Sequence, residues 1–229
     1  MDSSPESPAA DATPPQFVPP KLMPGRAPPP QPLDEPFVAS ALVHPLRAID
    51  LSLAEPDRVG ANVVAGIALT RIALVLLLTS LVFAIPYGCV LSLEAWWKVV
   101  ALTLGSTLIC LPSLFVFSSY LGQRMRLEQI LVLGLTIPAV AAVFTLGFAP
   151  ILAFLRATMT DEASQVPWRS ISNVLLSLAV LAGVAQLWRT WRAAREAAPS
   201  NLFALVLLVW HAVFLHVILR MGSVLQLGG

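Results

Sequence analysis

The sequence predicts an all-α fold: a polytopic transmembrane bundle of five helices, preceded by a disordered, proline-rich N-terminal arm. The first observation is composition, because 57% of the 229 residues are hydrophobic, only 12% are charged, and the mean hydropathy is +0.78. Ordinary globular domains carry about 25% charged residues. The second is that five stretches of 19 to 27 residues contain no charge, and a helix of about 20 apolar residues crosses the ~30 Å hydrocarbon core of a bilayer. The stretches run from Ile72 to Leu93, Val99 to Gln123, Gln129 to Leu155, Ser170 to Trp188 and Ala197 to Leu219.

Residues 1–49 are predicted to form the arm. Thirteen of the twenty prolines fall within residues 1–45. Proline fixes φ and lacks the backbone N–H, so these runs favour extended polyproline II, and few large apolar residues are present to build a core. We expect a flexible cytoplasmic spacer. The alternative is that the segment from Pro28 to Pro32 binds a partner protein that recognises proline motifs.

Residues 50–71 are predicted to form an interfacial helix or a helix that leads into the first span. Apolar residues recur there with rough helical spacing, and Pro56 suits a first helical turn. One long helix from Ala61 to Val90 is the alternative. In that case Arg71 would have to reach the membrane surface or find a partner.

The charges between the uncharged stretches predict the orientation of the five-helix transmembrane domain, residues 72–229. We name the membrane face that carries the N-terminus side one, and the opposite face side two. Among the basic residues that flank the spans, seven fall on side one, or eight if Arg71 is counted there, and four on side two. Because basic loops stay in the cytoplasm, we expect a cytoplasmic N-terminus and an external C-terminus. The side-one residues are Arg47, Arg58, Arg124, Arg126, Arg189, Arg192 and Arg195, and the side-two residues are Lys98, Arg156, Arg169 and Arg220.

Three prolines interrupt the second and third spans: Pro112, Pro138 and Pro150. An interior proline kinks a helix and frees one carbonyl, which needs another donor inside a bilayer. Ser113 and Thr136 are placed to supply that donor. Kinked helices can line a transport path, but they are also common as ordinary structure.

His211 and His216 are the candidate ligands of the last span. Five residues separate them by about 140° around a helix and about 7.5 Å along it. Helical metal pairs use i, i+3 or i, i+4 spacing, so these imidazoles are predicted to pack separately rather than share a metal. No carboxylate lies within any span, although an ion or proton path normally uses one.

The remaining polar and small residues of the fourth span predict helix packing. Ala179 and Gly183 form a small-x-x-x-small pair that allows close approach, and Asn173 and Gln186 can hydrogen-bond neighbouring helices. Phosphate-binding loops, dinucleotide fingerprints and paired Cys/His metal spacings are missing from the sequence. We therefore predict no catalytic, cofactor-binding or metal-binding residues, no cofactor, and no enzymatic activity.

A resemblance to a known family rests on the segments Lys98–Leu104, Ile109–Phe117 and Leu121–Arg124, together with the region from Ala141 to Leu155. These segments resemble uncharacterised bacterial five-span membrane proteins that are similar to the Yip1-like family. The resemblance covers about residues 60–225 and implies a five-helix architecture with a cytoplasmic N-terminus in the bacterial cytoplasmic membrane. Eukaryotic Yip1-like proteins bind small GTPases in vesicle traffic, but no residue set here maps onto that activity.

The predicted function is that of a multi-pass membrane protein with a non-catalytic role, which assembles with, anchors or regulates a membrane partner. The expected partners are the lipid bilayer and a protein or second copy within it, and nucleic acid is not expected. The alternative is a transporter or channel subunit whose kinked helices two and three line the path. Intramembrane acids or bases would support ion transport, whereas a carrier of lipid or apolar solute needs none.

Overall fold

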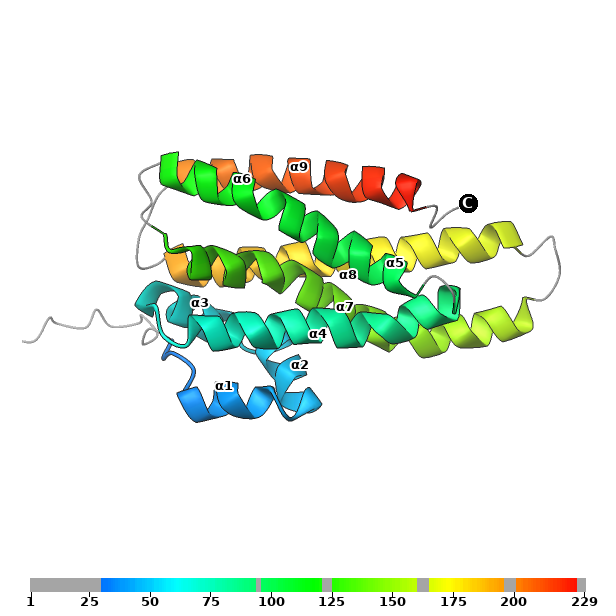
Figure 1. The fold of residues 1–229 in the computed structure, drawn as a ribbon, viewed down its shortest axis with the longest axis horizontal. Helices are drawn as coiled ribbons and strands as arrows, with labels where there is room; N and C mark the ends of the chain where they lie inside the picture. Colours follow the sequence, from blue (N-terminus) through cyan, green and yellow to red (C-terminus); the bar gives the residue numbers. More distant parts are fainter. Residues whose placement is uncertain (1–29, 94–95, 121–124, 160–164, 196–200, 226–229) are drawn as a thin grey trace, which may run out of the picture.

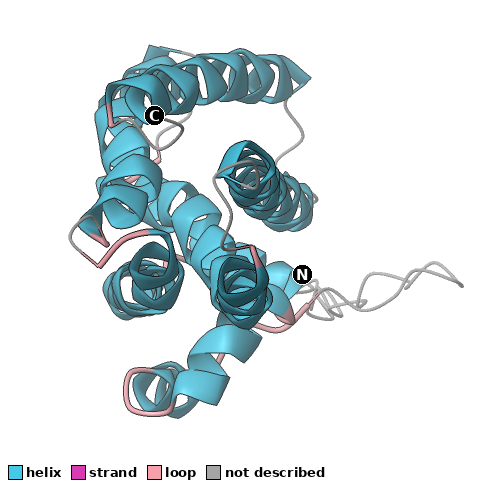
Figure 2. Cartoon of the chain, turned by 90° about the vertical axis from the view of Figure 1, so that its right-hand side faces the viewer, coloured by secondary structure: helices cyan, strands magenta, loops and turns pink. Residues whose placement is uncertain are grey.

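The computed structural model describes residues 30–93, 96–120, 125–159, 165–195 and 201–225 (Figure 1). Every regular element in these ranges is a helix, which confirms the all-α fold class. Figure 2, viewed from the side-two end, shows these helices and their connecting loops. The predicted arm lies outside the described residues as far as residue 29. In chain order the elements are α1 (Glu35–Ala41), α2 (Pro45–Leu53), α3 (Pro56–Ala65), α4 (Leu69–Leu91), α5 (Trp97–Val100), the π-helical segment η1 (Ala101–Gly105), α6 (Ser106–Tyr120), α7 (Leu127–Thr158), α8 (Gln165–Arg195) and α9 (Asn201–Val224).

Five helices are long and apolar enough to cross a membrane, as the sequence predicted. α7 is the central one, since 78% of its most apolar stretch is buried, against 22% for α9. α4 and α8 pack on α7, whereas α9 packs on α6 at the edge of the bundle (Figure 1). The spans are Leu69–Leu91, Trp97–Tyr120, Leu127–Thr158, Ser170–Arg192 and Ala204–Val224.

The predicted end of the arm at residue 49 is wrong, because helices begin at Glu35. α1 and α2 occupy residues assigned to the arm, and Leu33 and Val38 are almost completely buried. The reason lies in the last two prolines of the segment. Pro36 and Pro45 each stand in the first turn of a helix, where a fixed φ and a missing N–H are tolerated.

Residues 50–71 likewise do not form a single lead-in helix. Their first residues end α2, and α3 begins at Pro56, the residue predicted to open a helix. α3 stops at Gly66, whose φ is 71°, and Ala68 immediately before α4 has a φ of 54°. Two left-handed residues out of three interrupt helical hydrogen bonding. The alternative of one helix from Ala61 to Val90 is therefore also wrong.

Asn62 ties the N-terminal helices together. Its side chain is fully buried, and Oδ1 accepts a hydrogen bond of 2.6 Å from the N–H of Leu33. Its Nδ2 donates to the carbonyls of Leu33 and Ile67 at 3.3 and 3.2 Å. In addition, Gln129 in the first turn of α7 donates to the carbonyl of Val63 at 2.6 Å. These bonds fix α3 at the side-one end of the bundle.

The α1–α2 unit, residues 35–53, packs against the side of α4 (Figure 1). At its start Glu35 forms an ion pair of 2.7 Å with Arg71 in the first turn of α4, so this arginine has a partner. At the turn between α1 and α2, Pro45 lines a small cavity together with residues of α4 from Val75 to Phe83. The turn therefore lies about one to three helical turns deeper along α4 than Arg71.

The crossing of α7 and α8 confirms the prediction for Ala179 and Gly183. Ala179 is fully buried, and a Cβ added at Gly183 would lie 2.5 Å from the carbonyl oxygen of Ile137 on α7. Real Cβ atoms do not approach so closely, so only glycine permits this helix separation.

Candidate functional site

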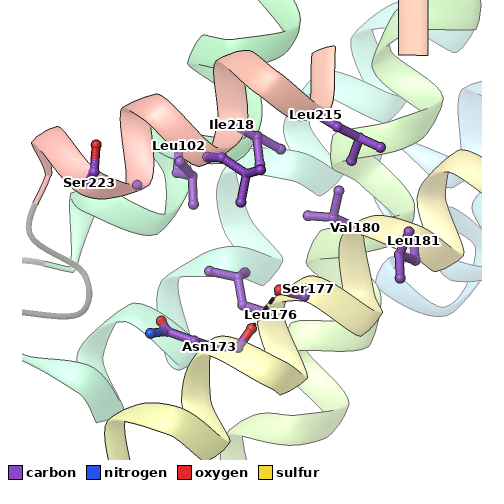
Figure 3. A pocket seen from close by; sticks show the side chains of 11 residues that line it. Leu102, Asn173, Leu176, Ser177, Val180, Leu181, Leu215, Ile218 and Ser223 are labelled. Atoms are coloured by element: carbon purple, nitrogen blue, oxygen red, sulfur yellow. Dashed lines mark hydrogen bonds between the residues drawn. The ribbon is translucent and has the colours of Figure 1, made fainter. Parts of the chain in front are cut away.

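An open cleft separates α8 from α9, although the two helices follow each other in sequence (Figure 3). Its volume is about 480 Å³, within the range typical of ligand pockets. α8 forms one wall between Asn173 and Leu181, α9 forms the other between Leu215 and Ser223, and Leu102 of the π-helical segment contributes to the lining. We call this site the α8–α9 cleft.

The lining of the α8–α9 cleft changes character along its length. Asn173 and Ser223 lie at the end near side two and Ser177 lies midway along α8, whereas Leu181 and Leu215 lie at the other end (Figure 3). The hydroxyl of Ser177 donates to the carbonyl of Asn173 at 2.8 Å. The side-chain amide of Asn173 forms no hydrogen bond with any residue that the structure describes. One end is thus polar and the other aliphatic.

Aromatic side chains close the gap between α8 and α9 beyond the aliphatic end. Trp188 of α8 stacks on His211 of α9, with ring centroids 5.8 Å apart and planes inclined by 25°. The Nδ1 of His211 lies 2.5 Å from the carbonyl oxygen of Leu207. Its Nε2 is buried and has no partner among the described residues. Trp210 packs edge-on against the same imidazole at 5.3 Å.

The two histidines of α9 point to different surroundings, as their spacing predicted. His211 is buried between indole rings, whereas His216 is exposed on the outer surface of the bundle. Within the described ranges, no three His, Cys, Asp or Glu side chains come close enough to hold a metal ion. The arrangement around His211 is one of aromatic packing.

Polar side chains within the spans mostly anchor one helix to another. Gln186 donates to the carbonyls of Ser52 and Leu53 at 3.2 and 2.9 Å, and so holds the end of α2 on α8, as a bridging role predicted. Trp210 donates from Nε1 to the carbonyl of Cys110 at 2.9 Å, which joins α9 to α6. Asn173, for which the same role was predicted, instead faces the cleft.

Ser113 and Thr136 do not serve the carbonyls that the prolines free. Ser113 donates to the carbonyl of Cys110 at 2.6 Å and Thr136 to that of Val132 at 2.9 Å. Pro112 and Pro138 instead free the carbonyls four residues before them, in the preceding turns. Short hydroxyl side chains bond within their own turn, which explains why this prediction was wrong.

A second polar feature lies on the exposed face of α2. Arg47 and Asp50 are both exposed and three residues apart, so they share one side of the helix, and exposed His44 immediately precedes α2. Arg47 donates to the hydroxyl of Ser40 and has no carboxylate within salt-bridge distance in the described ranges. We call this the α2 charged face.

Sequence reasoning missed both features. The cleft has a weak signal in the i, i+4 pair Asn173 and Ser177, which must share one helix face. The α2 charged face was hidden because its residues were assigned to the arm or counted only as loop charges.

Comparisons with protein-family models, with curated proteins and with solved structures found no match. The resemblance to Yip1-like proteins therefore stays a prediction, as does the orientation of the bundle in its membrane. Function has to be argued from the two features just described.

Proposed function

We propose that this chain is a non-catalytic integral membrane protein that assembles with a second copy of itself through the α2 charged face. Support for a non-catalytic role comes from the way polar side chains of the spans are used. Tyr87, Gln186 and Trp210 each donate to a backbone carbonyl of another helix, and such bonds hold a bundle together.

The observation that carries the proposal is the depth of α2. Pro45 and Ala48 line the same cavity as residues Val75–Phe83 of α4, beyond the point where the first span becomes uncharged. Arg47 and Asp50 stand between and just after them on the exposed side. An ionised side chain that faces hydrocarbon costs about 3 kcal/mol at the centre of a helix in the bilayer, less near the surface. A protein surface with opposite charges removes this cost.

The charges themselves indicate a second copy as that surface. Arg47 and Asp50 carry opposite signs and lie about 4.5 Å apart along α2. In a twofold interface, if one residue contacts a second residue of the other copy, the reciprocal contact also forms. Arg47 of one copy can therefore face Asp50 of the other, while Asp50 of the first faces Arg47 of the second. A single patch is then complementary to itself.

Charge reversal tests this assembly directly. In vesicles that contain two differently labelled populations, energy transfer should be strong for the unaltered protein and lost for Arg47→Asp alone or Asp50→Arg alone. A mixture of the two variants should recover it, because every cross-subunit pair is then opposite in sign. Glu128→Arg, an exposed reversal at the start of α7, is the matched control and should behave as the unaltered chain.

Recovery that fails in the mixed sample, or energy transfer that survives both reversals, would overturn the proposal. Transfer absent already in the unaltered protein would also overturn it, because the copies would then not assemble.

The alternative, a transporter with helices two and three lining a path, has less support. A Cβ at Gly134 of α7 would lie 2.7 Å from Cδ2 of Leu111 on α6. This contact favours tight packing where the two helices cross.

A further inference from the structure

We propose that the α8–α9 cleft binds one phospholipid from the side-two leaflet, with an acyl chain lying between the helices and the headgroup at the end that carries Asn173 and Ser223. This site is independent of the α2 charged face, which lies on a different helix, in the half of the membrane nearer side one.

The dimensions of the cleft match one leaflet. Its walls run from Asn173 to Leu181 and from Leu215 to Ser223, and eight helical steps on each wall correspond to about 12 Å. Half of a ~30 Å hydrocarbon core is about 15 Å. An acyl chain of a single leaflet therefore fills the cleft, whereas a transmembrane helix of a partner would need a groove that continues across both leaflets.

The far end of the cleft is closed to such a helix. Trp188 and His211 stack across the gap between α8 and α9, and Trp210 packs against the same imidazole. The closure lies about two turns beyond Leu181 on α8 and one beyond Leu215 on α9. The lining of the cleft itself stops at Leu181 and Leu215, near the midpoints of their two spans.

The polarity gradient sets the direction of the lipid. Asn173 lies three residues inside the start of the apolar span at Ser170, and Ser223 lies one residue before α9 ends. Both are therefore at the level of the side-two headgroups, where an amide and a hydroxyl can bond ester or phosphate oxygens. The aliphatic end formed by Leu181 and Leu215 receives the chain.

Photocrosslinking in vesicles tests site and direction together. The full chain is reconstituted in phosphatidylcholine that includes a small fraction of phosphatidylcholine with a diazirine either near the acyl carbonyl or near the middle of one chain. After irradiation, adducts are located by peptide mass spectrometry. We expect the first probe to mark the end near Asn173 and Ser223, and the second to mark the end near Leu181 and Leu215.

Filling the cleft separates a specific site from the lipid that surrounds any membrane protein. A Cβ at Gly222 would meet only Leu102, at 3.9 Å, so the side chain of Gly222→Phe can enter the cleft. It should lower labelling of the cleft by about tenfold and leave labelling of the exposed surface of α9 unchanged. Ala212→Phe, an exposed change on the same helix, is the matched control and should leave labelling of both the cleft and the exposed surface unchanged.

Ser177→Phe fills the cleft from the α8 wall, so the result does not depend on one variant folding. Labelling that spreads evenly over all lipid-facing helices, or that persists in both filled variants, overturns the proposal. So does a reversed order of the two probes. Lipid adducts that form elsewhere on the bundle but not at the cleft of the unaltered protein also overturn the proposal.

Discussion

Replacing Gly183 by alanine should destabilise the protein, whereas the same replacement at Gly147 should not. Both glycines lie inside long helices, Gly183 in α8 and Gly147 in α7. A Cβ at Gly183 would lie 2.5 Å from the carbonyl oxygen of Ile137 and 3.1 Å from its carbonyl carbon, whereas a Cβ at Gly147 would meet nothing within 4 Å. The two variants therefore differ in contact with a neighbouring helix and share the same change in helix propensity.

The magnitude follows from two opposing terms. Ordinary contact begins near 3.4 Å, so the Cβ at Gly183 and the Ile137 carbonyl oxygen, 2.5 Å apart, must separate by about 1 Å, and the obstructing atoms are backbone that cannot change rotamer. Overpacking of this kind costs about 1–3 kcal/mol. Alanine in place of glycine gains up to about 1 kcal/mol in a helix interior. We expect a net loss of about 1–2 kcal/mol for Gly183→Ala and a gain of up to about 1 kcal/mol for Gly147→Ala.

Thermal unfolding of the purified proteins in mild detergent measures the change in stability of both variants. One kcal/mol shifts the midpoint by about 2–4 °C in a chain of this length. The Gly183 variant should melt several degrees below the unaltered protein and the Gly147 variant at or above it. Equal midpoints for the two variants would refute the close crossing of α7 and α8.

Three further predictions concern the N-terminal helices and the topology. Deleting residues 1–45 should lower the melting temperature more than deleting residues 1–29, because the longer deletion also removes the buried side chains of Leu33, Val38 and Ala41; equal effects would contradict the placement of α1. Asn62→Ala should cost on the order of 3 kcal/mol in thermal unfolding, since two buried hydrogen bonds and one partly buried one are lost, and a neutral result would contradict the role of Asn62 in holding the N-terminal helices. In a variant without native cysteines, Ser200→Cys should react with a membrane-impermeant thiol reagent from the cytoplasmic side and Asp161→Cys from outside; reaction from the same side would exclude five spans.

The five spans could be predicted because the bilayer imposes them. Backbone groups in hydrocarbon must bond within their own helix, and charges are excluded there, so uncharged runs of sufficient length have one solution. The residues at which the spans begin and end were predicted less accurately. α4 begins at Leu69 rather than Ile72, because Arg71 lies within the first helical turn and pairs with Glu35 instead of marking a boundary. Arg71 and Glu35 are 36 positions apart in the sequence, so the local sequence pattern does not predict their ion pair.

The N-terminal segment was misread for a related reason. Composition over residues 1–45 is dominated by proline, which predicts disorder when it is averaged along the segment. The position of Pro36 and Pro45 in the first turn of a helix matters more than their number. What holds these short helices is the buried amide of Asn62 bonded to Leu33, again a contact between residues distant in sequence.

Polar side chains in the spans have three uses, and only the third indicates function. Many hydroxyls bond a carbonyl of their own helix, as Thr79 does with Val75 at 2.8 Å, and this use marks no site. Others link two helices, as Tyr87 does through the carbonyl of Ser172 at 2.6 Å. A polar side chain that does neither and still faces the membrane has an uncompensated desolvation cost. A ligand or partner must then supply the hydrogen bond or the opposite charge. Asn173 in the α8–α9 cleft and Asp50 of the α2 charged face belong to this third group. Because they lie in opposite halves of the membrane and on different helices, the effects of variants at the two sites should be additive, so failure of one proposal leaves the other standing.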